Sequence, residues 1–481
     1  MKKDKGAKNF KNSFKTRAFK VGGYSSAITL VAILIVFVIN IIMDQIPTRF
    51  TKFDTSDIEL YTISEQTKEI VGSLKDEVTI YHVAQSGSED VTITELLNRY
   101  SDLSNKITVV AKDPVLYPNF LSKYSDAAPS NNSIVVESAK RSQIIVNDKI
   151  YQYVYDYSGN RIASAFNGEK HLTSAIDYVT TDILPVVYAL TGHGETTLSE
   201  SLLSSISLEN LELKELSLIS AKAIPDDASC ILLAAPTVDI TSAECDGIIS
   251  YLESGGSMML ITSFTDIATP NLDTVMENYG VKKVPGLIFE GDERYSMGGY
   301  PHYLLPRINE HEITAPLVDG GFRVLLPLAH GIKTIDAYRS SLEITGLLGT
   351  SPSAYSKVAG YNMVTLEKEK DDIDGPFNVG VLVTEKVRGE TTKVVWIPSS
   401  GLVADEGNVL VGGANFDLFL NCLGFMCERE SSISIRSKNL LVNYLSMSAA
   451  DGRMWTIIFV IITPLVVLGA GVVVLIRRKK H

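Results

Sequence analysis

Two long apolar runs lie near the ends of this 481-residue chain, and shorter apolar segments alternate with helical patterns between them. The uncharged runs cover residues 24–43 and 455–476, which makes them 20 and 22 residues long. A helix of this length crosses the roughly 30 Å apolar core of a bilayer. We therefore predict a transmembrane helix in each run. A cleaved signal peptide is the alternative for the first, but residues 40–44 offer no small-residue cleavage pattern.

The pattern after the first run predicts a small α/β domain over residues 58–160. Ser64 is placed to cap a helix that ends near Leu74, and a strand follows at 78–83. Further segments are expected as a helix at 93–103 and strands at 107–111, 133–138 and 142–147. Their order fits a thioredoxin-like arrangement. Because the chain lacks Cys-x-x-Cys, oxidoreductase activity is not expected.

A second, larger α/β domain is predicted over residues 180–440. Apolar runs alternate there with helical stretches, in the order 186–190 (VVYAL), helix 198–208, 230–236 (CILLAAP), helix 242–252 and 257–263 (SMMLITS). Strands that are apolar throughout and alternate with helices are typical of a parallel sheet covered on both faces. Later, a hairpin is expected from Phe377 to Ile397 and a helix from Asn415 to Cys427. Residues 267–350 have weak periodicity and receive no assignment.

The most unusual stretch follows the first apolar strand of this larger domain and reads TGHGETT from Thr191 to Thr197. It is predicted as a turn between a strand and a helix, which is where α/β sheets bind ligands. The two glycines permit close approach to the backbone, and the acidic and threonine residues suit a helix N-terminus that holds an anion. The alternative is a tight loop whose histidine and glutamate hydrogen-bond each other. Both interpretations stay open, and the candidate binding residues are Thr191, Gly192, His193, Gly194 and Glu195.

Catalytic residues are not expected from the sequence. Covalent catalysis in such a fold needs a nucleophile on a strand-to-helix elbow. The two later apolar strands end in residues 234–236 (AAP) and 262–264 (TSF), without Gly-x-Ser-x-Gly or Gly-x-Cys-x-Gly around either. We therefore predict that the chain is not an enzyme, with a cryptic hydrolase as an alternative.

No cofactor or metal site is expected either. The four cysteines lack metal-ligand spacing, and His302 with the 310–312 cluster lacks the i, i+4 spacing of a zinc helix. The chain also has no glycine-rich loop ending in Gly-Lys-Ser or Gly-Lys-Thr, so it is not a nucleotide-hydrolysing motor.

Basic residues gather at the two ends of the chain. Residues 1–23 carry eight lysines and arginines, and residues 477–481 carry four. Without these twelve cations and Asp4, 32 basic and 55 acidic residues remain, a net charge of −23. The positive-inside bias then puts both basic tails in the cytoplasm and the acidic body outside the cell membrane. An acidic body also disfavours a nucleic-acid partner.

Several segments in the same order resemble one known family. They are residues 61–81 (YTISEQTKEIVGSLKDEVTIY), 188–195 (YALTGHGE), 311–314 (HEIT), 414–438 (ANFDLFLNCLGFMCERESSISIRSK) and 461–480 (IITPLVVLGAGVVVLIRRKK). Together with two terminal spans, they resemble the auxiliary components of bacterial ABC transport systems, the gliding-motility (GldG-like) family. One departure is that the family's Gly-Asp-Ser turn reads Ile-Pro-Ser-Ser at residues 397–400, so no ligand role is carried over to it.

The resemblance implies an extracytoplasmic auxiliary subunit that works beside an ABC permease and its ATPase subunit. It also implies that the central domain is similar in fold to class I glutamine amidotransferases. A stand-alone, surface-anchored protein that binds a polymer or a peptide is the alternative function. The resemblance does not indicate which substrate is transported.

Overall fold

The computed structural model describes residues 24, 28–38, 60–124, 130–155, 159–265, 267–387, 389–429, 435–441 and 464. Its contacts divide the chain into a larger unit, Met1–Gln152 with Phe166–Lys438, and a smaller unit, Tyr153–Ala165 with Asn439–His481. Residues 25–27 and 39–43 of the predicted span 24–43, all of the span 455–476 except residue 464, and both basic tails lie outside the described residues. Where residues are described, no helix is long and apolar enough to cross a bilayer.

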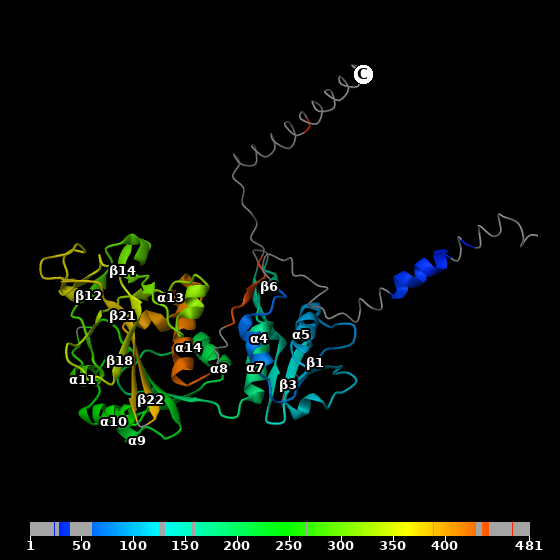
Figure 1. Cartoon of the computed structure of the whole chain (residues 1–481), viewed down its shortest axis with the longest axis horizontal. Helices are drawn as coiled ribbons and strands as arrows, with labels where there is room; N and C mark the ends of the chain where they lie inside the picture. The colour runs from blue at the N-terminus through cyan, green and yellow to red at the C-terminus, as the bar shows by residue number, and fades with distance from the viewer. Residues whose placement is uncertain are drawn as a thin grey trace, which may run out of the picture. The chain divides into compact units, whose positions relative to one another are not determined.

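The first part of the larger unit contains a four-stranded sheet in the order β2-β1-β3-β4 (Figure 1). β1 (Val78–Val83) is parallel to β2 (Ile107–Lys112) and antiparallel to β3 (Ser133–Glu137), which pairs with β4 (Ser142–Ile145). The strands predicted from the sequence are confirmed here to within two residues at each end. The sheet is mixed because the crossover between β1 and β2 contains a helix, whereas β3 and β4 are joined by a short turn.

The helices of this part begin where the sequence supplies caps. α4 (Glu65–Gly72) starts after Ser64, whose hydroxyl accepts a hydrogen bond from the Thr67 N–H, as the sequence predicts. α5 (Val91–Leu103) starts after Asp90, whose carboxylate accepts from the Ile93 N–H. The helices α4, α5 and α7 (Gly168–Thr180) pack against one another, and α7 also packs on β3 and β4.

The second part of the larger unit contains a ten-stranded sheet, half of which is parallel. The parallel strands, in spatial order, are β8 (Glu212–Leu216), β7 (Val186–Leu190), β9 (Ala228–Ala234), β10 (Ser257–Ile261) and β22 (Glu390–Ile397). This confirms the parallel arrangement predicted for residues 184–263.

The other half of the sheet is antiparallel, which corrects the expectation of a parallel sheet for the whole domain. β21 (Asn378–Val387) turns tightly into β22 and must therefore run antiparallel to it. The strands beyond are β18 (Leu342–Gly349), β15 (Arg307–Ile308), β17 (Ile332–Thr334) and β11 (Val281–Lys283), each antiparallel to its neighbour. The hairpin was predicted, but its consequence for the sheet direction was not.

Apolar cores lie on both faces of the ten-stranded sheet. Along β9, Cys230, Leu232 and Ala234 belong to one core while Ile231 and Leu233 belong to the other. Side chains alternate across a strand, so a strand that is buried on both faces must be apolar throughout. The first core also contains α8 (Glu200–Leu208) and α14 (Ala414–Met426), and the second contains α10 (Ser242–Glu253) and α11 (Pro270–Asn278).

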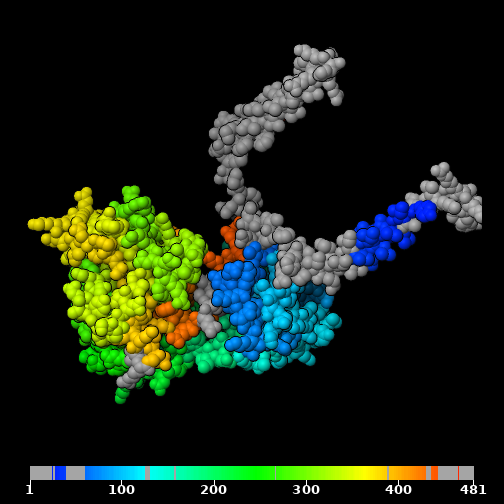
Figure 2. Space-filling model, viewed as in Figure 1, coloured from blue at the N-terminus to red at the C-terminus, as the bar shows by residue number. Residues whose placement is uncertain are grey.

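Two small three-stranded sheets and several short helices complete the larger unit. The sheets are β12 (Leu287–Phe289), β19 (Tyr355–Lys357) and β20 (Ile373–Asp374), and β13 (Ser296–Met297), β14 (Tyr300–Leu304) and β16 (Leu326–Pro327). The short helices are η1 (Leu121–Lys123), α6 (Asn147–Ile150), α9 (Leu218–Ala221), η2 (Glu293–Tyr295), α12 (Ala315–Asp319), η3 (Gly360–Asn362), η4 (Ser400–Val403) and α13 (Asp405–Leu410). The segment around η3, yellow in Figure 2, stands on the surface, and Val364 is 93% exposed.

Three more strands lie at the boundaries of the smaller unit. They are β5 (Tyr151–Tyr155), β6 (Arg161–Phe166) and β23 (Lys438–Asn439). Within this unit, the guanidinium carbon of Arg161 lies 3.8 Å from the centroid of the Tyr153 ring, a cation–π contact.

Candidate functional site

The predicted binding residues lie where the strand order of the ten-stranded sheet reverses. β7 has β8 on one side and β9 on the other, so successive strands are added first to one side of β7 and then to the other. In open α/β sheets, the carboxyl ends of the strands at such a reversal form the crevice in which ligands bind. The loops after β7 (191–199) and after β9 (235–241) are therefore the candidate site, and we call them the switch-point loops.

Backbone hydrogen bonds hold the first switch-point loop to both neighbouring strands. The Thr191 N–H donates to the Leu216 carbonyl at the end of β8, with an N···O distance of 3.0 Å. The Thr196 N–H donates to the Ala234 carbonyl at the end of β9, at 2.8 Å. In addition, the His193 carbonyl accepts from two N–H groups of the second loop. The loop thus links the two strands on either side of β7.

Both glycines of the loop have a positive φ angle, a backbone conformation that glycine adopts readily. The φ angle of Gly192 is +123° and that of Gly194 is +67°. Both lie in a region that residues with a Cβ atom disfavour. A Cβ on Gly194 would lie 2.1 Å from the Thr237 hydroxyl oxygen, whereas one on Gly192 would have only the tip of Ile219 at 3.9 Å. Gly194 is therefore required by packing, while the backbone at Gly192 is exposed and open to a neighbour.

His193 is buried between two carboxylates. Its Nδ1 lies 3.1 Å from Glu195 Oε1, and its Nε2 lies 3.1 Å from Glu244 Oε2 on α10. Only an imidazolium donates from both nitrogens, so this geometry suits a positive ring between two negative groups. Glu195 also accepts from the N–H groups of Gly192 and His193, at 3.1 and 3.0 Å. The predicted alternative, a histidine bonded to its neighbouring glutamate, is the arrangement that the structure contains.

Glu244 joins this cluster through the N-terminus of α10. It forms a capping box with Thr241, whose N–H and hydroxyl donate to the carboxylate at 2.9 and 2.8 Å. Burial alone would raise the pKa of Glu244, but the bonds from Thr241 and from His193 outweigh it and lower that pKa. Its second oxygen, Oε1, is buried without a hydrogen-bond partner. The cluster is therefore an ion network with one unused acceptor.

The expected helix N-terminus at Thr196 and Thr197 is wrong. α8 begins at Glu200, and its cap is Ser199, whose hydroxyl oxygen accepts from the Leu202 N–H. The same hydroxyl donates to Asp405 Oδ1, at 2.8 Å. The N-terminus of α8 is thus capped by Ser199, and it lies beyond residues 195–197, where an anion was predicted to bind.

The second switch-point loop has a strained elbow without a nucleophile. Ala235 follows β9 directly and has φ of +51°, which is unfavourable for any residue with a Cβ. Its N–H donates to the Ile261 carbonyl at the end of β10, at 2.8 Å, which helps to hold the conformation. Strained strand-to-helix turns of this kind present the nucleophile in many hydrolases. Here the side chain is a methyl group.

The other place where a nucleophile was sought, at the end of β10, holds a buried polar network. The Thr262 hydroxyl lies 2.8 Å from His330 Nε2 and accepts from the Trp396 indole N–H at 2.8 Å. His330 Nδ1 lies 3.0 Å from the Gly331 carbonyl and so must be its donor, which leaves Nε2 to accept from Thr262. Burial lowers the pKa of His330 from 6.5 to about 3, so the ring stays neutral.

The space beside this network is small. The cavity next to Thr262 and Trp396 measures about 20 Å³ and is lined further by Asp273, Lys283 and His330. A volume of this size holds about one water molecule. The hydroxyl–imidazole pair is therefore a packed element of the core, without room for a substrate beside it.

Sequence reasoning found the first loop but missed its partners. Glu244 is visible in the sequence as the fourth residue of a Thr-x-x-Glu capping box, yet nothing there indicates that it faces a histidine 51 positions earlier. His330 and Trp396 carry no local signal of their contact with Thr262. No group of three or more histidine, cysteine, aspartate or glutamate side chains suited to a metal occurs among the described residues, and the cysteines 230, 245, 422 and 427 are free thiols.

One protein-family model matches the part of the chain that contains this site. Residues 184–414 match the family described as an ABC-type uncharacterized transport system. The match supports an ABC transport auxiliary family and an auxiliary role in an ABC transport system. It is a transport family and not a family of enzymes. Residues 58–154 match a domain of unknown function (DUF7088), and no curated protein matches the chain.

Solved structures give only weak likenesses. The mmIFT52 N-terminal domain is 15% identical, with 51% of this chain and 99% of that one covered and a TM-score of 0.39. PurLQS from Thermotoga maritima is 11% identical (51% and 100% covered, TM-score 0.25). A putative GMP synthase protein from Thermoplasma acidophilum is 10% identical (52% and 96% covered, TM-score 0.28). At these scores the likenesses support no assignment of fold or activity.

Proposed function

We propose that this chain is a membrane-anchored, GldG-like auxiliary component of an ABC transport system, with its body outside the cytoplasm. The observation that carries the proposal is the family match over residues 184–414, which contains both switch-point loops. We also infer that the chain is anchored in the membrane, that both of its ends lie in the cytoplasm, and that its body contacts a permease and its ATPase subunit.

A helical segment near the N-terminus supports the membrane anchor. Residues 28–38 are helical, and each of their large apolar side chains is at least 42% exposed. These side chains are Ile28, Leu30, Val31, Ile33, Leu34, Ile35, Val36, Phe37 and Val38. A helix that is apolar on every side is stable when it is buried in protein or in a bilayer. The eight cations of residues 1–23 then favour a cytoplasmic N-terminus, and the four of 477–481 a cytoplasmic C-terminus.

The body is proposed to work by contact and not by turnover. Ala235 puts a methyl group on the strained elbow, and the cavity beside Thr262 has room for about one water molecule. The sequence contains no phosphate-binding loop, so the energy of nucleotide hydrolysis must come from a separate ATPase subunit. That energy would reach the body mechanically, through the two predicted spans or through the permease.

The first switch-point loop is the surface that we propose for this contact. Gly192, Gly194, Thr196 and Thr197 are exposed, while His193 beneath them is held between two carboxylates. A loop that is held in place by its buried histidine and exposes its other residues is suited to a rigid contact, because it loses little conformational freedom on binding. We also propose a thioredoxin-like fold for the four-stranded sheet and an amidotransferase-like fold for the parallel half of the larger one.

Site-specific photo-crosslinking in cells tests this contact. A photoreactive amino acid replaces Thr197 in the loop, and the matched control replaces Lys282, an exposed residue of β11 at the far end of the same sheet. We expect a crosslink to a multispan permease from position 197 and none from position 282. Equal crosslinking from both positions, or a crosslink only to a soluble peptide or a polymer, would favour the stand-alone binding protein instead.

A further inference from the structure

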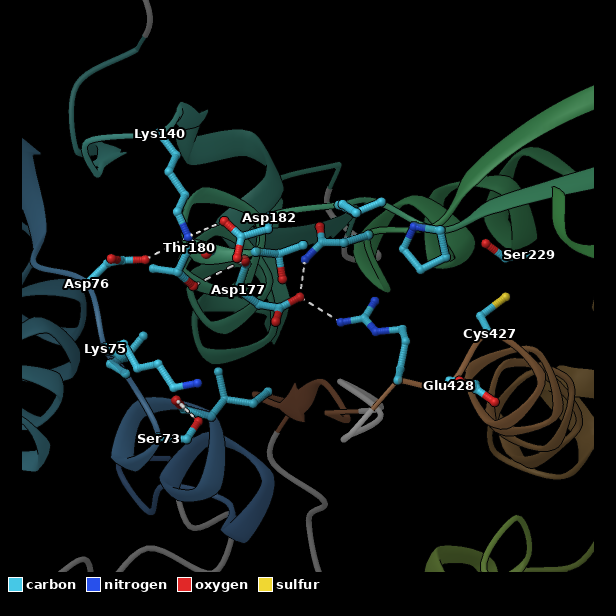
Figure 3. Close-up of a pocket in the computed structure, with 17 residues that line it drawn as sticks. Ser73, Lys75, Asp76, Lys140, Asp177, Thr180, Asp182, Ser229, Cys427 and Glu428 are labelled. Atoms are coloured by element: carbon cyan, nitrogen blue, oxygen red, sulfur yellow. Dashed lines mark hydrogen bonds and ion pairs between the residues drawn. The ribbon is translucent and has the colours of Figure 1, made fainter. Parts of the chain in front are cut away.

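A cavity in the larger unit lies away from the switch-point loops. It measures about 570 Å³, within the range of small-molecule sites. Figure 3 shows its walls, which come from the end of α4, the turn between β3 and β4, the end of α7 and the segment after α14. The charged residues among them are Lys75, Asp76, Lys140, Asp177, Asp182, Glu428 and Arg429.

The acidic groups of this cavity already have cationic or amide partners. Lys140 Nζ lies 2.8 Å from Asp76 Oδ2 and 2.7 Å from Asp182 Oδ1. Asp177 Oδ2 accepts from Arg429 Nη2 and from the Asn210 side-chain amide, both at 2.6 Å. Glu428 forms an ion pair with Lys393, at 3.0 Å. Little negative charge is therefore left for a cationic ligand.

The donors, in contrast, are only partly used. The Arg429 side chain is nine-tenths buried, and its Nη1 has no hydrogen-bond partner. A buried guanidinium nitrogen without an acceptor is costly, because its hydration is lost and not replaced. Lys75, on the α4 side of the cavity (Figure 3), is exposed and forms no ion pair with any described residue. The Ser229 hydroxyl accepts from the Val186 N–H, so its own proton is available to a ligand.

We propose that this cavity binds a small molecule through a carboxylate or phosphate group. Arg429, Lys75 and Ser229 supply the donors, and charge-assisted bonds from a guanidinium and an ammonium are the strong kind in proteins. Arg429 lines the cavity but its Nη1 is buried, so binding through this nitrogen includes a rotation of the guanidinium that exposes it. This site is independent of the ABC assignment, since no residue of the switch-point loops takes part.

Isothermal titration calorimetry of the full chain in mild detergent tests the site. The probes are inorganic phosphate and succinate, each titrated at constant ionic strength. We expect saturable binding of at least one of them, which also tells whether phosphate or carboxylate is preferred. Lys75→Ala and Ser229→Ala should each weaken binding about tenfold, on the scale of one lost hydrogen bond to a charged group.

Matched controls separate binding from folding. Lys68→Ala removes an exposed lysine from α4 that faces Glu65 and does not line the cavity, so it should bind as the unaltered chain does. Arg429→Lys keeps a charge but loses the guanidinium that contacts Asp177, so we expect weaker binding, and its melting temperature is measured beside that of the unaltered chain. The proposal is wrong if neither anion binds saturably, or if Lys75→Ala and Ser229→Ala bind as tightly as Lys68→Ala.

Discussion

Replacing His193 by alanine should destabilise the central domain strongly. The substitution removes the ring that lies 3.1 Å from both Glu195 and Glu244 and leaves these two carboxylates facing a gap. The side chains of His193, Glu195 and Glu244 are only 6%, 12% and 4% exposed, so water screens their charges poorly. Breaking a buried ion pair by removing one partner costs about 3–5 kcal/mol. The sequence alone predicts, in contrast, that a histidine in this loop can be replaced with folding nearly intact.

Thermal unfolding of the full chain in detergent measures this effect. A loss of 3–5 kcal/mol lowers the melting temperature of a domain of this size by about 6–20 °C. The control is His302→Ala, a histidine whose Nδ1 has no hydrogen-bond partner and whose contacts are with aromatic rings. It should cost about 1 kcal/mol, as most substitutions do.

The pH dependence of the stability tests the same ion network in a second way. The pKa of Glu244 in the folded chain lies below its ordinary value of 4.5, so its stabilisation is present above pH 4.5 and is lost as the pH falls through the lower value. In His193→Ala, Glu244 loses the hydrogen bond and the interaction with His193 that help to lower its pKa. The difference in stability between the two proteins should therefore narrow as the pH falls below 4.5. A loss below about 1 kcal/mol that does not change with pH would refute the ion-network account.

Four further predictions concern other parts of the chain. Gly194→Ala should destabilise more than Gly321→Ala, because their φ values of +67° and +64° are alike but only the first puts a Cβ against Thr237; equal melting temperatures would contradict this. Thr262→Val should cost about 2–4 kcal/mol, since it leaves the His330 ring and the Trp396 indole unpaired, and should shift tryptophan fluorescence, while Thr262→Ser should do neither. His330 has a pKa of about 3 in the folded chain and 6.5 as its ordinary value, so below pH 6.5 it stays neutral while the unfolded chain takes up a proton. This group should therefore lower the stability of the fold by about 1.4 kcal/mol for each pH unit below 6.5, and His330→Gln should remove that slope. Leu34→Arg should oppose membrane insertion by about 2.5–3.5 kcal/mol and lower the membrane-bound fraction, whereas Leu34→Ala should not.

The local elements were largely predictable, because their signals lie in neighbouring residues. Ser64 caps α4 as expected, and the apolar runs at β7, β9 and β10 form parallel strands. In the antiparallel half of the sheet the β21–β22 hairpin was predicted, but β11, β15 and β17 were not, since they have only two or three residues each and no periodicity to detect. Such short strands are defined by their partners in space and not by their own sequence.

The site could be located from the sequence but not described. The glycines and their position after an apolar strand were enough to place Thr191–Glu195 at the carboxyl edge of the sheet. The contact between His193 and Glu244 depends on how α10 packs beside the loop, which no local pattern encodes. The same holds for Ala235, whose strained backbone carries no signature in an alanine. A ligand or partner role for the loop stays a prediction.

Affinity purification of the tagged chain from its own membranes, in several mild detergents, tests the central claim most directly. The account predicts that a multispan permease and a nucleotide-binding ATPase subunit copurify with it in fixed proportion, and that Leu34→Arg reduces the yield of both. Recovery of the chain alone in every detergent, together with hydrolysis of amides or glycosides by the purified protein, would contradict the account and favour an enzyme.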